Sequence, residues 1–520
     1  MRQLVAISML ALLAQPGLAR APASTAPRRM AKAVLADKIH GGWAGKMIGV
    51  SYGAPTEFRS NGAINEGALT WSPERVSNAL GQDDLYVGMT LAETMDRLGF
   101  DATVEQYGEA FKDSQYDLWH ANAGARRLLN LGIKAPMSGH PKYNIHANDI
   151  DFQIEADFIG LMSPGLPQES NKYCARIGRV MNHGDGLYGG MFVSGMYTAA
   201  FFERDVRTVV AQGLACLPPE SGYARVIRDV LDWSAKYPGD WKKTWRLIQD
   251  TWDAEDPCPD GALTPFNIDA RINGAYIALG LLYGERDFGR TLEIATRAGQ
   301  DSDCNPSTAG GILGVMLGYG GIPDSWKRGV PALADRKFAY TSSSLNDICR
   351  STLERALTLV RLAGGAVSDA DVIIPEQAPR AAPLEQWDMG APVSRVAVTD
   401  TAWSFNGFSA VAGPSSADKP VLMRASAAGA EATLRFTGAA LAVAGDMTPE
   451  GGRADVYLDG QLAHAIDAYV ATRTHDNDLW HVYGLAQGPH TLRIVTRADA
   501  DPRSTGTTVS IGQAVVYRAR

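Results

Sequence analysis

The chain of 520 residues is 45% hydrophobic and carries a formal net charge of −8. This length suffices for two domains with cores of their own, and the mild acidity without a basic stripe argues against nucleic acid as a partner. Five cysteines spread over the chain are too few for a disulfide framework. No pattern in the sequence indicates an oligomeric state.

The N-terminus has the pattern of an export signal. Arg2 precedes an apolar run over residues 4–13, and the stretch that follows ends in small residues at Ala19. We therefore predict a signal peptide over residues 1–19 and a secreted or periplasmic protein; an unstructured N-terminus is the alternative. The apolar run is too short to span a bilayer and no other stretch approaches that length, so we expect no membrane span.

Residues 30–363 show helical periodicity almost throughout. Apolar residues recur at helical spacing in segments that Gly, Pro, Asn and Asp separate. The clearest segments are Asp84–Leu98, Thr103–Phe111, Ala121–Leu131, Phe152–Leu161, Leu187–Phe202, Tyr223–Lys236, Ile268–Tyr283, Phe288–Ala298 and Leu345–Leu362. No convincing alternating strand interrupts them, so we predict an all-α domain over these residues.

Composition and period both change after the helical region. Residues 364–393 are rich in Ala, Pro and Gly, which predicts a linker or a segment that wraps around the helical domain. Within residues 394–520, the stretches 432–436, 454–458 and 491–495 alternate with period two, and Asp459-Gly460 is a turn signal. We predict a β-sandwich that packs on the helical domain; glycan binding by its aromatic residues stays open.

Two acidic pairs stand at the starts of predicted helices. Asp301-Ser302-Asp303 lies just before a helix that begins near Pro306, and Asp83-Asp84 opens an earlier one. A helix start needs only one short acceptor as a cap, so each pair leaves one carboxylate over. Brought together, the four carboxylates would form a hard oxygen site suited to Mg²⁺, Mn²⁺ or Ca²⁺. Solvated turns are the alternative.

Two rows of glycines recur at one-turn spacing near these acidic residues. Glycine inside a helix costs about 1 kcal/mol relative to alanine, so each row requires a packing reason. We predict that each row lets the backbone of a partner approach closely. The rows are Gly45, Gly49 and Gly53, and Gly310, Gly314 and Gly318.

These elements, in this order, resemble the ADP-ribosylglycohydrolase family. The resemblance rests on Glu57 after the first glycine-rich helix, on Asp83-Asp84, and on Asp301-Ser302-Asp303 before the second. It extends from about Lys38 to Trp326 and includes the motifs at 149–153, 183–186 and 322–326. It implies the compact helical bundle of that family. The C-terminal region is similar to the jelly-roll accessory domains of secreted carbohydrate-active enzymes.

The resemblance also implies roles for particular residues. It implies a divalent metal centre, with two ions and Mg²⁺ as the first choice and Ca²⁺ or Mn²⁺ as alternatives. The metal ligands it implies are Gln82, Asp83, Asp84, Asp301 and Asp303, and the catalytic groups are Glu57, Asp84 and Asp301. Family members often carry Ser or Thr at the positions of Gln82 and Cys304. Because a thiol is a poor ligand for Mg²⁺, Cys304 leaves the affinity and identity of one metal open.

The middle of the helical region supplies candidates for substrate binding. The matching part of the family faces the substrate, so we predict that Asp149, Asp151 and Gln153 contact ligand. Capping in a solvated loop is the alternative. His183 is predicted to contact a sugar or leaving group, with a structural role weighed equally.

Together these features predict an exported, metal-dependent hydrolase that cleaves an N- or O-glycosidic bond at an anomeric carbon. Export and the accessory domain favour a small-molecule or oligosaccharide substrate, in particular a furanoside-type carbohydrate. Removal of ADP-ribose from a modified protein is the first alternative. A non-catalytic sugar-binding protein that retains a relic of the site is the second.

Overall fold

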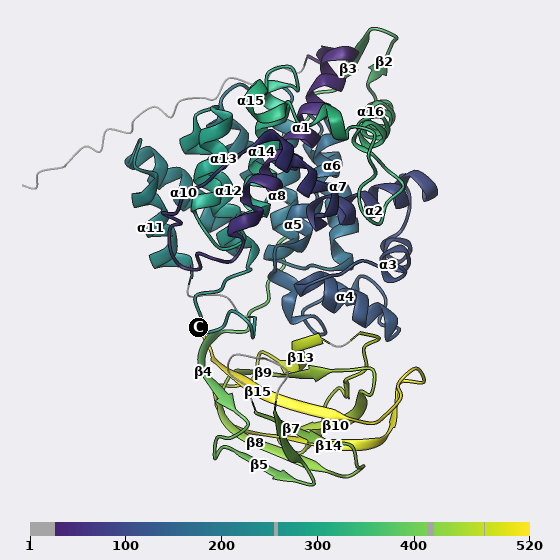
Figure 1. Cartoon of the computed structure of the whole chain (residues 1–520), viewed down its shortest axis with the longest axis vertical. Coiled ribbons are helices and arrows are strands. Elements are labelled where there is room, and N and C mark those ends of the chain that lie inside the picture. The colour runs from purple at the N-terminus through teal and green to yellow at the C-terminus, as the bar shows by residue number, and fades with distance from the viewer. Residues whose placement is uncertain (1–25, 254–257, 413–420, 473) are drawn as a thin grey trace, which may run out of the picture.

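The computed structural model describes residues 26–253, 258–412, 421–472 and 474–520. The predicted signal peptide, residues 1–19, lies outside the described residues. Figure 1 shows two parts, a helical domain above and a region of strands below. No described helix is both long enough and apolar enough to cross a membrane.

The helical domain confirms the predicted fold class. Most predicted helices form within one or two residues of their expected ends, but the segment 152–161 is two short helices that separate at Ala156. The helices are α1 (Lys32–Gly53), α2 (Asp83–Leu98), α3 (Val104–Lys112), α4 (His120–Asn130), α5 (Asp151–Glu155), α6 (Asp157–Leu161), α7 (Pro167–Ile177), α8 (Asp185–Ala200), α9 (Val206–Leu214), α10 (Gly222–Lys236), α11 (Trp241–Trp252), α12 (Ala270–Gly284), α13 (Phe288–Arg297), α14 (Cys304–Leu317), α15 (Asp324–Lys327) and α16 (Leu345–Leu362).

Glycines of each row lie against the backbone of the other segment, and Gly45 and Gly310 face each other, which confirms the predicted close approach of two backbones. A Cβ atom built on Gly45 would lie 2.1 Å from the carbonyl oxygen of Gly310, and one on Gly49 would lie 2.1 Å from that of Pro306. Gly53 lies in the same way against Ser302. The contacts run in opposite chain directions, so α1 and α14 are antiparallel. The end of α1 therefore lies beside the beginning of α14.

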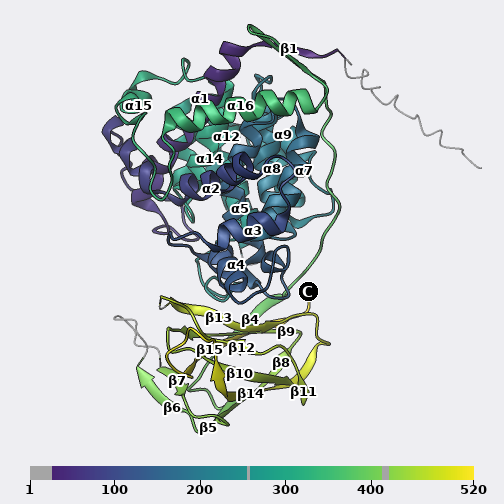
Figure 2. The same cartoon turned by 90° about the vertical axis from the view of Figure 1, so that its right-hand side faces the viewer.

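A small sheet joins the two ends of the helical domain. Strand β1 (Arg28–Ala31) pairs with β3 (Asp371–Ile374), which also pairs with β2 (Ala366–Val367). Short strands thus occur at the start of the helical region and within the predicted linker. Figure 2 shows the chain after β3 running down the side of the helical domain toward the lower region. Along this path the Tyr188 hydroxyl donates to the carbonyl oxygen of Pro383, as a wrapping segment requires.

Two antiparallel sheets form the C-terminal region. One has the order β11-β10-β14-β8-β5, with β12 beside β10, and the other has the order β13-β9-β15-β7-β6, with β4 beside β15. Buried side chains of both sheets share one core. The strands are β4 (Ala391–Ala397), β5 (Trp403–Asn406), β6 (Ser409–Ala412), β7 (Val421–Ala425), β8 (Glu431–Gly438), β9 (Ala440–Met447), β10 (Gly452–Leu458), β11 (Gln461–Leu462), β12 (Ile466–Asp467), β13 (Thr474–Val482), β14 (Gly488–Ala500) and β15 (Val509–Arg518).

The sheet region packs on the helical domain, as predicted. Apolar side chains from both sides form one buried cluster that includes Ile145, Ala442 and Tyr517. His481, itself buried, lies with Nε2 2.6 Å from the carbonyl oxygen of Pro141. Such a cluster with polar contacts at its margin is typical of a fixed contact between domains.

We expect Gly49→Ala to lower the free energy of unfolding of the helical domain by about 3 kcal/mol, because the added methyl group meets the α14 backbone. Thermal or denaturant unfolding measures this change. Gly81→Ala is the matched control, since no atom lies within 4 Å of the position that its added methyl group would take. Equal unfolding midpoints for the two variants would contradict the close approach of the helices.

Candidate active site

Three helix ends bring the acidic residues of distant sequence segments together. Asp83 and Asp84 are the first residues of α2, and Asp301 and Asp303 immediately precede α14. Glu57 follows the short 3-10 helix Ala54–Thr56 at the end of α1. One carboxylate oxygen from each of Glu57, Asp301 and Asp303 lies within 4.8 Å of the others. Asp84, Asp303 and Cys304 form a second group with the same limit.

The two acidic pairs differ in how their carboxylates meet the backbone at the helix starts. Asp303 occupies the N-cap position of α14, yet its side chain makes no capping hydrogen bond. The start of α2 likewise has no side-chain cap. Asp83 Oδ1 accepts from the backbone N–H of Asp84 at 3.1 Å, so part of the first pair serves its helix start, whereas the Asp303 side chain does not cap α14.

Three buried carboxylate oxygens in this cluster accept no hydrogen bond from the described residues: Oδ1 of Asp84, Asp301 and Asp303. Asp84 Oδ1 has the Lys46 ammonium at 3.7 Å, so Oδ1 of Asp301 and of Asp303 are the two that most need a partner. A buried carboxylate oxygen without a partner is costly, so it calls for a donor or a cation. Hard cations such as Mg²⁺, Mn²⁺ and Ca²⁺ take oxygen ligands of this kind. The residues present therefore fit a divalent metal ion.

A buried lysine lies behind the cluster. Lys46 of α1 donates to Asp157 Oδ2 at 2.8 Å, and its Nζ lies 3.7 Å from Asp84 Oδ1. Burial lowers the pKa of Lys46, but the opposing effect of the carboxylates of Asp157 and Asp84 is larger. The pKa is therefore raised, and the ammonium group stays charged. On the other side, the Cys304 thiol donates to Asp84 Oδ2 at 3.1 Å. Asp84 is thus oriented by two neighbours.

Burial and mutual repulsion raise the pKa values of the acidic residues. Burial raises the pKa of Asp83 to about 7, helped by the charges of Asp84 and Asp301. The pKa of Asp301 also rises to about 7, because of burial and then of Glu57 and Asp84, against hydrogen bonds from Asp303 and Cys304. Burial and the charge of Asp84 raise the pKa of Glu57, which lies at the exposed rim. A bound cation would reverse these shifts.

The Cys304 thiol stays protonated in this setting. Burial raises its pKa well above the usual value, and the carboxylates of Asp301 and Asp303 raise it further. A neutral thiol is a hydrogen-bond donor to Asp84 rather than a thiolate ligand.

The acidic cluster lies at a cavity of about 390 Å³, within the range of small-molecule sites. Phe58 and Phe266 form an apolar wall, with ring centroids 4.9 Å apart. Trp119, which is 54% exposed, lies at the rim. Apolar ring faces beside carboxylates are typical of sites that bind sugars, which present both C–H and O–H groups.

The predicted metal ligands and catalytic groups lie together. The side-chain amide of Gln82 is also hydrogen-bonded to another residue of the protein. Gln82 lines the cavity beside Asp83, and its Nε2 donates to Asn78 Oδ1 at 2.7 Å. The amide nitrogen is therefore held by the protein.

The predicted substrate-binding residues are divided. Asp151 lines the cavity, but its carboxylate also accepts from the backbone N–H groups of Ala121 and Asn122 and so holds the start of α4. Gln153 is fully buried and accepts from the Tyr223 hydroxyl at 2.6 Å. The structure brings Asp151 to the cavity and leaves Gln153 behind its wall.

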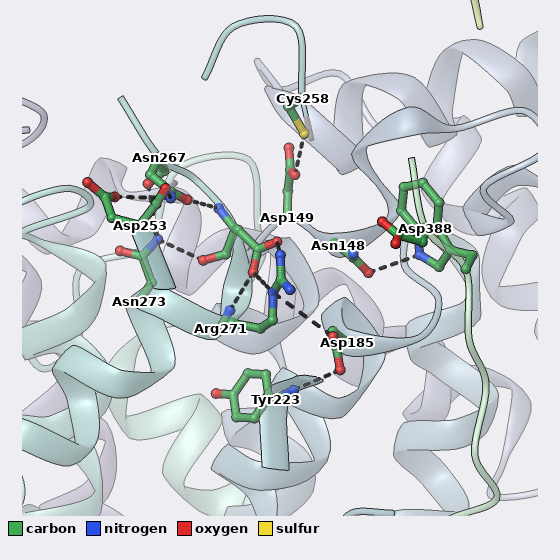
Figure 3. Close-up of polar contacts among 12 residues, drawn as sticks. Asn148, Asp149, Asp185, Tyr223, Asp253, Cys258, Asn267, Arg271, Asn273 and Asp388 are labelled. Atoms are coloured by element: carbon green, nitrogen blue, oxygen red, sulfur yellow. Dashed lines mark hydrogen bonds and ion pairs between the residues drawn. The ribbon is translucent and has the colours of Figure 1, made fainter. Parts of the chain in front are cut away.

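Asp149 and His183 lie outside the cavity lining. Asp149 is fully buried and accepts from the Cys258 thiol, as Figure 3 shows. His183 Nδ1 lies 3.3 Å from Glu385 Oε2 in the wrapping segment. In the same region Asp185 accepts from the backbone N–H of Tyr223 and lies beside Arg271. These contacts connect helix starts.

Sequence reasoning missed several residues of the site. Lys46 lies in the apolar, glycine-rich second half of α1, whereas the other lysines of this helix lie in its first half. Asp157 and Glu155 are buried acids whose partners, Lys46 and Asn122, are distant in sequence. The one available signal was a lysine within a half of the helix that is otherwise too apolar to have a polar face.

The helical domain matches a known family. Residues 31–366 match the family model described as ADP-ribosylglycohydrolase. This match covers more than half of the chain, and it defines a hydrolase of the glycosyl-hydrolase type. The chain belongs to the ADP-ribosylglycohydrolase family, which confirms the resemblance found in the sequence. The membership also favours an enzyme over the non-catalytic alternative.

Individual relatives are distant. The A type blood alpha-D-galactosamine galactosaminidase of Flavonifractor plautii is 41% identical over 76 residues, which are 15% of this chain and 7% of that protein. The chain thus spans a small part of that relative. A solved ADP-ribosylglycohydrolase-related protein complex is 15% identical, with a TM-score of 0.41, over 62% of this chain and 98% of that one. The CBM36-1 domain of a xylanase from the hindgut metagenome of Trinervitermes trinervoides is 11% identical, with a TM-score of 0.18, over 24% and 94%.

We expect the metal-free protein to lose stability as the pH rises from 4 to 7. The raised pKa of Asp301 means that the folded state holds its proton more tightly than the unfolded chain in that window, so deprotonation favours unfolding. Asp301→Asn should therefore raise the free energy of unfolding of the metal-free protein at pH 8 by on the order of 1–3 kcal/mol. Denaturant unfolding in EDTA measures it. Asp324→Asn, at an exposed position, is the control. An Asp301→Asn protein that is less stable than the wild type at pH 8 would contradict the repulsion among the buried carboxylates.

Proposed function

We propose that this protein hydrolyses a glycosidic bond at an anomeric carbon with the help of divalent metal ions. The observation that carries the proposal is the set of three buried carboxylate oxygens without hydrogen-bond donors among the described residues, beside a cavity with an aromatic wall. Asp84, Asp301 and Asp303 would hold the metal, and Asp83 and Glu57 lie where they can complete its surroundings. Several carboxylates would offset the charge of two ions, with Mg²⁺ as the expected one.

A divalent ion at this site supplies a Lewis acid that lowers the pKa of water and holds sugar hydroxyls. The residues of the chain would transfer the proton, orient a metal ligand and exclude water. Glu57 lies at the rim, and burial and the charge of Asp84 raise its pKa, so it is suited to hold or transfer a proton. Lys46 and Cys304 fix the orientation of Asp84 through contacts behind the cavity. Phe58 and Phe266 exclude water from one side.

The lining of the cavity favours a carbohydrate over ADP-ribose. Among its described lining residues there is no lysine or arginine that would pair with a pyrophosphate. A furanoside-type sugar on a small-molecule or oligosaccharide aglycone fits this neutral and acidic lining. The export signal predicted in residues 1–19 agrees with a substrate outside the cytoplasm. Removal of ADP-ribose from a modified protein is the second candidate, because the family membership itself favours it.

A panel of nitrophenyl furanosides and pyranosides, together with ADP-ribosylated protein, tests the substrate. We expect metal-dependent release of nitrophenol from a glycoside, abolished by EDTA and restored by Mg²⁺. Activity on ADP-ribosylated protein alone would replace the carbohydrate proposal by the second candidate.

We expect Asp301→Asn to lower turnover of that substrate at least a thousandfold, because the variant loses a carboxylate of the metal centre. Initial rates at saturating Mg²⁺ measure the loss. Asp324→Asn removes an exposed carboxylate on α15 and should leave the rate unchanged. Full activity in the Asp301→Asn variant would disprove the site assignment.

Cys304→Ser tests whether the thiol limits the metal affinity. A serine hydroxyl keeps the hydrogen bond to Asp84 and is a harder ligand than sulfur, so we expect Mg²⁺ to bind several times more tightly. Titration of Mg²⁺ against activity or calorimetric heat gives the affinity. Cys349→Ser is the control outside the cluster; weaker Mg²⁺ binding in Cys304→Ser would oppose this explanation.

A further inference from the structure

A second group of metal-ligating side chains shares no residue with the acidic cluster. His120 begins α4, His146 lies in the short 3-10 helix Ile145–Asn148, and Asp149 follows that helix directly. His146 Nδ1 lies 2.7 Å from Asp149 Oδ2, and His120 Nδ1 lies 3.8 Å from the same oxygen. One ligand atom from each residue lies within 4.8 Å of the others. Two imidazoles thus converge on one buried carboxylate.

The backbone at His120 is strained, which is an independent observation. Its φ angle is +45°, in the left-handed region that non-glycine residues avoid. Such strain concentrates at functional sites, where the surroundings fix the conformation. Here Asp151 accepts from the two N–H groups that follow His120 and holds the turn. The result is a His120 ring that faces His146 and Asp149.

The carboxylate between the rings is oriented from behind. The Cys258 thiol donates to Asp149 Oδ1 at 2.8 Å, while Oδ2 faces the two histidines. Figure 3 shows the thiol directed at the Asp149 carboxylate. A partner on the distal oxygen of a ligating carboxylate is the usual support for a metal site. Cys258 would have this supporting role.

The group is reached from a cleft between the domains. His120 and His146 line a cavity of about 360 Å³ together with Asp260 of the helical domain and Met447 and Asp478 of the sheet region. Exposed fractions of 20% for the His120 side chain and 13% for that of His146 leave both rings accessible from this cleft. An ion can therefore enter without unfolding the domain.

The donor set selects a different metal from that of the acidic cluster. Two imidazole nitrogens with one carboxylate suit Zn²⁺ and other transition metals, whereas carboxylates alone suit Mg²⁺ and Ca²⁺. Tetrahedral zinc with ligands at about 2.0–2.1 Å separates neighbouring ligand atoms by about 3.4 Å. His120 Nδ1 lies 3.8 Å from Asp149 Oδ2, close to that separation, whereas the 2.7 Å contact of His146 Nδ1 with the same oxygen is a hydrogen bond that an ion would replace. Small side-chain adjustments would complete the geometry.

We propose that His120, His146 and Asp149 form a transition-metal site, with Zn²⁺ as the expected ion and the fourth position open to the interdomain cleft. The site is independent of the proposed glycosidase activity. It ties the strained start of α4 to the segment before α5. Because His120 also lines the cavity of the acidic cluster, the ion would stiffen one wall of that cavity.

Zinc binding to the full chain, freed of metal by chelation and refilled with Zn²⁺, tests the site. We expect one tightly held zinc per chain by mass spectrometry, at least tenfold weaker binding in His146→Ala or His120→Ala, and unchanged binding in Asp301→Asn. His140→Ala and His183→Ala are matched controls, since these two rings also lie close together, with centroids 4.8 Å apart. Zinc binding that survives in His146→Ala, or that is lost in Asp301→Asn, would overturn the proposal.

A second measurement needs no variant, so it tests the site even if the histidine variants do not fold. X-ray absorption of zinc-loaded wild-type protein should show scattering from two imidazoles and light oxygen ligands. A spectrum without imidazole scattering would place the zinc elsewhere and overturn the site. This result does not depend on any glycosidase assay, so it stands apart from a failure of the proposed activity.

Discussion

The contact between the backbones of α1 and α14 is the constraint on which the candidate active site depends. Side chains are absent along both facing rows, so the helices approach until carbonyl oxygens occupy the space of Cβ atoms. Because the helices are antiparallel, this contact places the end of α1 beside the start of α14. Glu57 and the pair Asp301 and Asp303 are thereby neighbours. Glycine lowers the stability of each helix. The same glycines allow the close contact that places the carboxylates side by side.

Charge balance is the second constraint. Lys46 is held mainly by Asp157 and reaches Asp84 only at 3.7 Å. The remaining carboxylates of the cluster therefore have no matching positive group nearby among the described residues, and burial strengthens their repulsion. The repulsion in such a buried cluster is relieved in one of two ways, by protonation of carboxylates or by a bound cation. The proposed divalent ion would be the second of these, and it would supply the chemistry of the proposed function.

Much of this arrangement is readable from the sequence, for physical reasons that differ between residues. Helical periodicity predicts α10 and α16 because each has one buried face. Glycine spacing predicts the close helix contact, and the acidic pairs stand out because one cap cannot use two carboxylates. Gln153 was placed with the ligand by its polar surroundings in sequence, but its partner is Tyr223, 70 positions away. Pairings of that kind, like Lys46 with Asp157, depend on the fold and leave no local pattern.

The sheet region bounds the approach to the candidate site. Trp119 and His120 are common to the walls of the acidic cavity and of the interdomain cleft, whose far side carries Met447 and Val470. The sheet region is held there by the buried apolar cluster between the domains and by His481. A substrate that extends past Trp119 must therefore pass along the sheet region. Its packing on the helical domain shapes access to the carboxylates, whether or not any of its own side chains binds a sugar.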